Sequence, residues 1–405
     1  MSREFSGHWY APNSNERYGG KAIHQNSTLR LILWKHDNFI NYDLLLGETL
    51  DGIKLTAILC NRRHQHHPNI ETFISETTFE ISALLIGAHI HSLNELSELG
   101  IAFTFSGLHQ WLEYGAKEKP PGQIEVHEYL GRRIPFSLHD EARSERTCFE
   151  YHEKSNYVVS FWQEEKKLGS FLNHSYFTEL WMSDFLSFVT QQKIFTRDAS
   201  LRSPRLRIST EMIKPYYNKN ASFDDGRILI QFHKIQDRIP SLWEEWCRLE
   251  TEYRPLIHHH IKHLTTEQLE VSDIFLDLAI TVEFYGRKRF SLDKFEPIIN
   301  RIWEEQPEII RNFLGKKSSF SKSARLFRNE CAHLTPQKPV NRYNLDELKE
   351  LQLKQIHLCW KLNILCKTII LSELGFSHDE ISRMALDPQT TNHFQIPSIN
   401  SQQLI

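Results

Sequence analysis

The sequence predicts a multidomain α+β protein, in which a mainly-β domain of sandwich or barrel-like type precedes an all-α helical bundle. Up to about residue 170, short segments rich in β-branched and aromatic residues alternate with Gly, Asn, Asp and Pro. From Pro240 onward, apolar residues recur at helical spacing instead. These observations place the β-rich domain at 1–235, with one helix near 176–192, and the bundle at 240–386. The polar tail 387–405 is predicted to be disordered.

The predicted strands are short, and many of them alternate apolar with polar residues. Several such strands in succession are typical of a sandwich or a barrel. We expect them at 28–34, 52–60, 72–82, 100–114, 122–130, 146–153 and 157–165, with further strands at 205–210 and 227–235. Two polar stretches, the histidine-rich 61–69 and 214–226, are predicted to be loops.

The first helices of the bundle are delimited by capping residues and prolines. Ser241 with Glu244 has the pattern of a capping box and opens a helix that we expect to run to residue 264. A helix over 272–286 is apolar almost all round, which predicts a central position. The next helix starts near Asp293 and is interrupted at Pro307.

Three further helices complete the bundle. One spans Phe320–Pro336, and a long one follows over Asn344–Leu374, with Gly375 as its stop signal. Ser377 with Glu380 then forms a second capping-box pattern that opens a short final helix.

The bulk composition excludes several classes of protein. The chain has 405 residues and a net charge of −3, so any affinity for nucleic acid must come from a local patch. It has no apolar stretch long enough for a transmembrane helix, and its N-terminus has no secretory signal. Its six cysteines lack zinc-finger spacing. We therefore expect a cytoplasmic protein with reduced thiols and no membrane partner.

The helix expected at Phe320–Pro336 has two different faces. Its apolar face carries Phe320, Ala324, Phe327, Cys331 and Leu334. Its polar face carries Lys322, Arg325, Asn329 and His333, with Arg328 on the flank. One face would anchor the helix, and the other would either bind a phosphate-containing substrate or be an ordinary solvated surface.

Arg328 and His333 are the candidate catalytic pair. The dipole of the last helical turn favours a protonated His333, which suits proton transfer near neutral pH. The guanidinium of Arg328 matches the geometry of a phosphate. Six basic residues and no acidic one lie between Arg311 and Asn329. The same Arg-to-His spacing occurs elsewhere in the chain, so residue chemistry alone slightly favours a solvated basic face.

Residues 328–333, Arg-Asn-Glu-Cys-Ala-His, resemble the Arg-polar-x(3–5)-His motif on a late helix of HEPN domains. More specifically, the chain is similar to ApeA-like HEPN proteins. The weaker similarities are FLDLAITVEFYGRKRF (275–290), LSELGFSHDEI (371–381) and GHWYAP (7–12) at the start of the β-rich domain.

The resemblance implies a metal-independent endoribonuclease that acts as a toxin in anti-phage abortive infection. Arg328, Asn329 and His333 would be catalytic, and RNA would supply its own 2′-hydroxyl nucleophile. Lys316, Lys317, Lys322 and Arg325 are expected to bind RNA. The resemblance also implies a homodimer or higher homo-oligomer with a composite site, a possible phage-encoded trigger and a regulatory β-rich domain. We expect no metal and no cofactor.

An alternative is a catalytically silent HEPN-type module that binds a nucleotide or a partner protein. His259 and His263, at i and i+4, form a weaker candidate metal pair that lacks a third ligand in the sequence. Glu283 interrupts an apolar helix and is either a buried acid paired with an arginine, which we expect, or a site residue. Arg328 and His333 lie about 140° apart on a regular helix, so their convergence needs a frayed helix end, a long reach by the arginine, or a second subunit.

Overall fold

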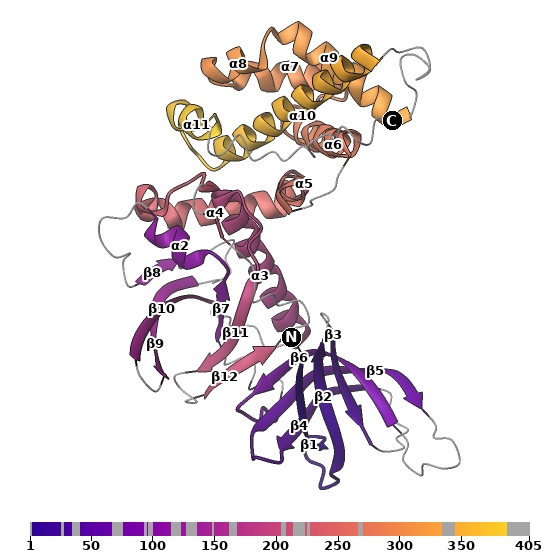
Figure 1. The fold of residues 1–405 in the computed structure, drawn as a ribbon, viewed down its shortest axis with the longest axis vertical. Coiled ribbons are helices and arrows are strands. Elements are labelled where there is room, and N and C mark those ends of the chain that lie inside the picture. Colours follow the sequence, from indigo (N-terminus) through magenta and orange to yellow (C-terminus); the bar gives the residue numbers. More distant parts are fainter. Residues whose placement is uncertain are drawn as a thin grey trace. The chain divides into compact units, whose positions relative to one another are not determined.

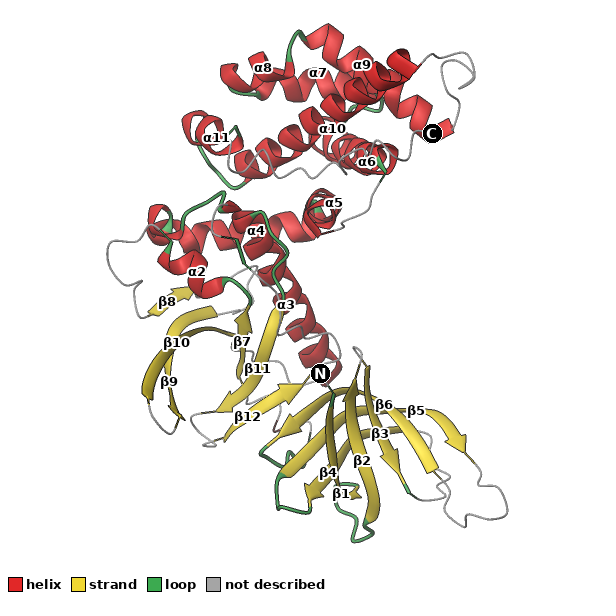
Figure 2. Cartoon of the chain, viewed as in Figure 1, coloured by secondary structure: helices red, strands yellow, loops and turns green. Residues whose placement is uncertain are grey.

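The structure, a computed structural model, describes residues 2–25, 28–34, 41–66, 76–92, 95, 100–114, 123–126, 136–147, 150–161, 168–203, 208–213, 223–224, 227–265, 270–333 and 345–386. It forms two compact units. One comprises Met1–His109, Glu118–Ser183 and Ile194–Ser222, and the other comprises Gln110–Lys117, Asp184–Lys193 and Phe223–Ile405. The predicted order of a β-rich part followed by a helical part is confirmed (Figure 1, Figure 2). The tail 387–405 lies outside the described residues.

Six strands near the N-terminus close into a barrel (Figure 1). They are β1 (Arg3–Tyr10), β2 (Tyr18–Gln25), β3 (Thr28–Leu33), β4 (Asn41–Thr49), β5 (Lys54–His66) and β6 (Glu76–Ile86). Their order is β3-β2-β1-β4-β5-β6, and β3 also pairs with β6, which closes the ring. Trp9, Leu31 and Phe79 are fully buried in its core. Gly47 lies against Trp9, since a Cβ there would come within 2.7 Å of the indole.

The second group of strands extends the same antiparallel sheet in the order β6-β12-β11-β7-β10-β9-β8. These strands are β7 (Gly100–Phe105), β8 (Gln123–Val126), β9 (Phe136–Thr147), β10 (Glu150–Phe161), β11 (Thr196–Ser203) and β12 (Ile208–Ile213). Two helices occur in the same part of the sequence, α2 (Leu108–Glu113) and α3 (Leu168–Thr190).

Four predictions for the β-rich part are wrong. The strand expected at 146–153 is instead the end of β9 and the start of β10, which pair antiparallel from Thr147 and Glu150. The strand expected at 100–114 ends at Phe105, and α2 follows it after Gly107, whose φ of 73° lets the chain turn. Residues 227–235 form no strand, because the N–H groups of Leu229 and Ile230 bond to the carbonyl of Val189 instead of a sheet. The loop expected at 61–69 is strand as far as the end of β5.

The helical part comprises α4 (Ile239–Glu252), α5 (Arg254–Thr265), α6 (Val271–Phe290), α7 (Phe295–Glu305), α8 (Glu308–Leu314), α9 (Lys317–His333), α10 (Leu345–Glu373) and α11 (His378–Ala385). Helix α6 contacts α5, α7, α9 and α10, as its apolar sequence predicts. Gly286 lets α7 approach α6, because a Cβ there would lie 2.1 Å from a side-chain atom of Ile298. This close packing of α6, α7 and α9 positions the candidate site.

The first predicted helix of the bundle is in fact two helices. Helix α4 ends at Glu252, and α5 begins at Arg254, because Pro255 has no N–H with which to continue α4. The capping box predicted at Ser241 is also wrong, since α4 starts earlier and the Ser241 hydroxyl donates to the Arg238 carbonyl. The second capping box, Ser377 with Glu380, is confirmed at the start of α11.

Within the described part of the chain, no helix combines the length and apolar character needed to cross a membrane.

Candidate functional site

Helix α9 is anchored by the apolar face that the sequence predicts. Phe320, Ala324 and Phe327 are buried, and the ring of Phe327 lies 4.4 Å from that of Phe275 on α6. Leu334, the last residue of the predicted stripe, lies outside the described residues. Since this face packs on α6, the polar face of α9 is left to contact other groups.

A groove of about 640 Å³ borders that polar face. It is lined by Glu283 and Arg287 from α6, by Asp293 and Lys294 from the α6–α7 connection, by Phe295, Glu296, Pro297 and Asn300 from α7, and by Arg325, Arg328 and Asn329 from α9. This volume lies within the range of small-ligand sites. The structure therefore brings three of the predicted site residues, Arg325, Arg328 and Asn329, to one groove.

Arg328 is held in the groove by a carboxylate from α6. Its Nη2 donates to Oε2 of Glu283 at 3.0 Å, while Oε1 of Glu283 accepts from Nη2 of Arg287 at 2.5 Å. The Glu283 side chain is only 11% exposed. The expected pairing of Glu283 with an arginine is therefore confirmed. The Nε–H of Arg328 is buried and has no partner among the described residues, so the guanidinium is only partly satisfied.

Two other cations of α9 are neutralised by α7. Arg325 pairs with Glu296 at 2.8 Å, and Lys317 pairs with Glu304 at 2.7 Å. The stretch from Arg311 to Asn329 contains no acidic residue in the sequence, but in the structure acidic side chains of α7 lie beside two of its cations. Lys316 and Lys322 are exposed, and no ion pair of theirs is found within the described part of the chain.

The remaining predicted catalytic residues differ in how far the structure describes them. The side chain of Asn329 lines the groove. His333 is the last residue of α9, as expected, but its side chain lies outside the described residues. The separation of the Arg328 and His333 side chains therefore stays a prediction.

Sequence reasoning missed Arg287, Glu296 and Asn300 as groove residues. Within one helix, the sequence does show which groove residues share a face. Glu283 and Arg287 on α6 are four residues apart, and so are Glu296 and Asn300 on α7. Nothing in the sequence shows that these faces and the polar face of α9 meet. That meeting depends on packing such as the contact between Gly286 and Ile298.

Among the described residues, no group of three His, Cys, Asp or Glu side chains that could hold a metal ion is found around the candidate pair or elsewhere. His259 Nδ1 and His263 Nε2 lie 3.6 and 3.8 Å from Oδ2 of Asp277, but the ammonium of Lys262 is closer, at 2.6 Å. Burial lowers the pKa of His263 to about 4. His263 is thus a neutral imidazole beside a Lys262–Asp277 ion pair.

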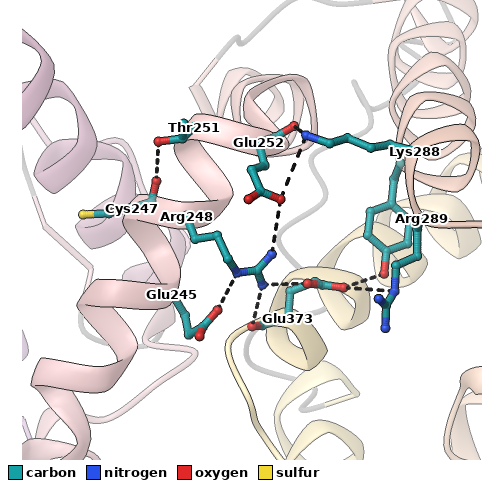
Figure 3. Close-up of polar contacts among 9 residues, drawn as sticks. Glu245, Cys247, Arg248, Thr251, Glu252, Lys288, Arg289 and Glu373 are labelled. Carbon is teal, nitrogen blue, oxygen red and sulfur yellow. Dashed lines mark hydrogen bonds and ion pairs between the residues drawn. The ribbon is translucent and has the colours of Figure 1, made fainter. Parts of the chain in front are cut away.

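A second charged cluster joins α4, α6 and α10, and we call it the Arg248 network (Figure 3). It consists of Glu245, Arg248, Glu252, Tyr285, Lys288, Arg289 and Glu373. Arg248 donates from Nε to Glu245 and from Nη2 to Glu373, at 2.7 Å each. The hydroxyl of Tyr285 donates to the other oxygen of Glu373 at 2.7 Å. Burial, together with Glu373, raises the pKa of Tyr285 far above its usual value.

Comparison with known proteins identifies no relative of the chain. No family model matches the chain, and neither a curated protein nor a solved structure is significantly similar to it.

Proposed function

We propose that this chain is a metal-independent endoribonuclease of an anti-phage abortive-infection system, and that the groove beside α9 is half of its active site. The observation that carries the proposal is the position of Arg328. Its guanidinium lines the groove next to Asn329 and keeps a buried Nε–H without a partner in the described structure. A phosphate oxygen would supply the missing acceptor.

The reaction would begin with the 2′-hydroxyl of the RNA attacking the adjacent phosphorus. His333, at the end of α9, would take the hydroxyl proton or give one to the leaving 5′-oxygen. Arg328 would stabilise the charge that develops on the phosphate oxygens, and Asn329 would position one of them. The P–O5′ bond breaks as the O2′–P bond forms, giving a 2′,3′-cyclic phosphate and a 5′-hydroxyl.

Glu283 gives this groove a resting state. With no RNA bound, its carboxylate shares the charges of Arg287 and Arg328. An incoming phosphate competes for Arg328, while Arg287 can continue to neutralise Glu283. The exchange leaves no buried charge unpaired, which avoids the large cost of an isolated ion.

The second half of the site would come from another copy of the chain. Arg328 and His333 are five positions apart, or about 140° around a regular helix, so one helix does not aim both at the same atom. If the site is composite, RNA cleavage per chain will rise with protein concentration together with the dimer fraction measured by ultracentrifugation. Full activity from a strictly monomeric protein would contradict this part of the proposal.

One observation favours a second candidate function, the catalytically silent binding module. Arg325, Arg328 and Lys317 are already paired with carboxylates, and the groove has the volume of a small-ligand site. A module that only binds a nucleotide needs no free arginine. The two candidates differ in one outcome, which is whether RNA is cut.

The discriminating experiment is RNA cleavage by the wild type, Arg328→Ala and His333→Ala in the presence of EDTA. Arg301→Ala and His357→Ala are matched controls, because both side chains lie on exposed helical surfaces outside the groove. We expect the two site variants to lose at least about 100-fold in rate, as is usual for a general acid–base or a charge-stabilising group, and the controls to remain active. Equal RNA integrity with all five proteins would reject the nuclease.

A further inference from the structure

We infer that Asn300 reads a base of the bound RNA, with adenine as the expected base. This inference rests on the proposed function for its ligand class, but it concerns a wall of the groove that the cleavage chemistry does not use. Asn300 lies on α7, one helical turn after Glu296, and lines the groove. None of the predicted catalytic residues lies on α7.

The amide of Asn300 lacks a partner. Its Oδ1 is buried and accepts no hydrogen bond from any described residue. Two other amides in the same unit are used: Gln306 donates to the Ile302 carbonyl at 3.1 Å, and Gln192 exchanges two hydrogen bonds of 2.7 Å with the backbone of Asp224. The buried Oε1 of Gln352 also lacks a partner among the described residues, but Gln352 does not line the groove. An unpaired buried acceptor at a groove wall therefore calls for a ligand that donates.

The missing partner must be a donor, and this requirement limits which part of RNA can supply it. Phosphate oxygens carry no proton at neutral pH, so they suit Arg328 and not Oδ1 of Asn300. The donors of RNA are the N–H groups of the bases and the 2′-hydroxyl. The Asn300 side chain as a whole is partly exposed, and its terminal amide turns easily about χ2, which would bring Oδ1 to a ligand in the groove.

An asparagine amide presents a donor and an acceptor side by side. Adenine offers the complementary pair on two edges, with the N6 amino donor beside the N7 or the N1 acceptor, whereas cytosine offers it on one, with N4 beside N3. The amide–adenine pairing is also a recurrent one. Single-stranded RNA exposes such edges when its bases are splayed out of a stack. The groove would thus hold a phosphate on the α9 side, at Arg328, and a base on the α7 side, at Asn300.

The test uses binding to RNA that cannot be cut. Short 2′-fluoro homo-oligomers of A, C and U lack the 2′-hydroxyl, so they remove both the nucleophile and the competing donor. Their binding to the full chain is measured by fluorescence anisotropy. We expect the wild type to bind the A oligomer about 10-fold more tightly than the others, as one good base contact allows. Asn300→Ala should bind all three alike, and the volume-matched Asn300→Leu should do the same.

Asn312→Ala is the matched control, because Asn312 is an exposed residue of α8 outside the groove. It should keep the wild-type preference. A preference that survives in both Asn300 variants, or a wild type that binds the oligomers without preference or not at all, would overturn the inference. A preference for C or U that the Asn300 variants lose would keep the role of Asn300 and overturn the choice of adenine. Since cleavage is not measured, failure of the nuclease proposal would show separately, as intact natural RNA.

Discussion

Two arginine–glutamate clusters of the helical unit look alike in composition and differ in completeness. In the Arg248 network, Nε, Nη1 and Nη2 of the arginine all face acceptors, namely Glu245, Glu252 and Glu373 (Figure 3). In the groove, Arg328 has one carboxylate, and its Nε–H is buried without a partner among the described residues. The second cluster borders a groove that a ligand can enter.

The difference separates a structural charge cluster from a candidate site. The Arg248 network holds α4, α6 and α10 together, and each nitrogen of Arg248 already faces a carboxylate. An incomplete set beside an open volume retains hydrogen-bonding capacity, which is costly in the free protein and is recovered on binding. Positive charge in the sequence therefore indicates less about function than unpaired donors and acceptors at a groove do.

The largest expected difference between the two clusters is in the free energy of unfolding that each arginine contributes. Arg248→Met keeps the aliphatic stem but leaves Glu373, which is 12% exposed, without its shortest ion pair. We expect the free energy of unfolding to fall by about 1–3 kcal/mol. Arg328→Met should cost less than about 1 kcal/mol, because Glu283 keeps Arg287. Urea unfolding of the two variants measures both values, and equal losses would contradict the distinction.

A second effect concerns Glu250, a buried acid of α4 close to the Arg248 network in sequence. Burial, and next the nearby Asp184, raise its pKa to about 9, although Arg254 opposes them. When the chain unfolds, the pKa returns to its ordinary value of 4.5. Between these values the folded chain binds the extra proton, so stability falls as pH rises, by about 1.4 kcal/mol per pH unit.

Above pH 7, Glu250 should dominate this slope, because burial raises the pKa of Asp184 only to about 7. Glu250→Gln should therefore flatten the loss of stability between about pH 7 and pH 9. Chemical unfolding of the full chain at several pH values, followed by helical circular dichroism, checks this. An unchanged slope in the variant would show that Glu250 is ionised in the folded protein.

The smallest effect is on binding in the groove. Glu283→Gln removes the charge that competes for Arg328, so uncleavable RNA should bind about threefold more tightly at low salt, and less so at high salt. Glu350→Gln is the control, because Glu350 pairs with Lys354 on the exposed surface of α10, outside the groove. Fluorescence anisotropy measures both. Weaker binding by Glu283→Gln would mean that Glu283 positions Arg328 for RNA and does not compete with the phosphate.

The sequence predicted the division into β-rich and helical parts and the two-faced α9, because hydrophobic periodicity reports directly on burial. It also predicted that Glu283 pairs with an arginine, since a carboxylate in an apolar helix needs a cation. It did not predict that Glu296 and Glu304 neutralise Arg325 and Lys317. Those pairs join residues 29 and 13 positions apart, and they depend on how α7 packs beside α9.

The strands of the barrel could also be predicted only in part from the sequence. Strands β1, β2 and β4 were missed, although β3, β5 and β6 lie within or near predicted strands. β2 contains Gly19 and Gly20, which lower its intrinsic strand propensity. Closure of the ring supplies the pairing that compensates, and closure is a property of the whole set of strands.

The most direct test of the central claim is the chemistry of the RNA ends left by the wild type in EDTA. We expect fragments that carry a 2′,3′-cyclic phosphate and a 5′-hydroxyl, and we expect Arg328→Ala to leave the same RNA intact. Intact RNA with the wild type, or the same fragments from Arg328→Ala, would contradict the nuclease proposal.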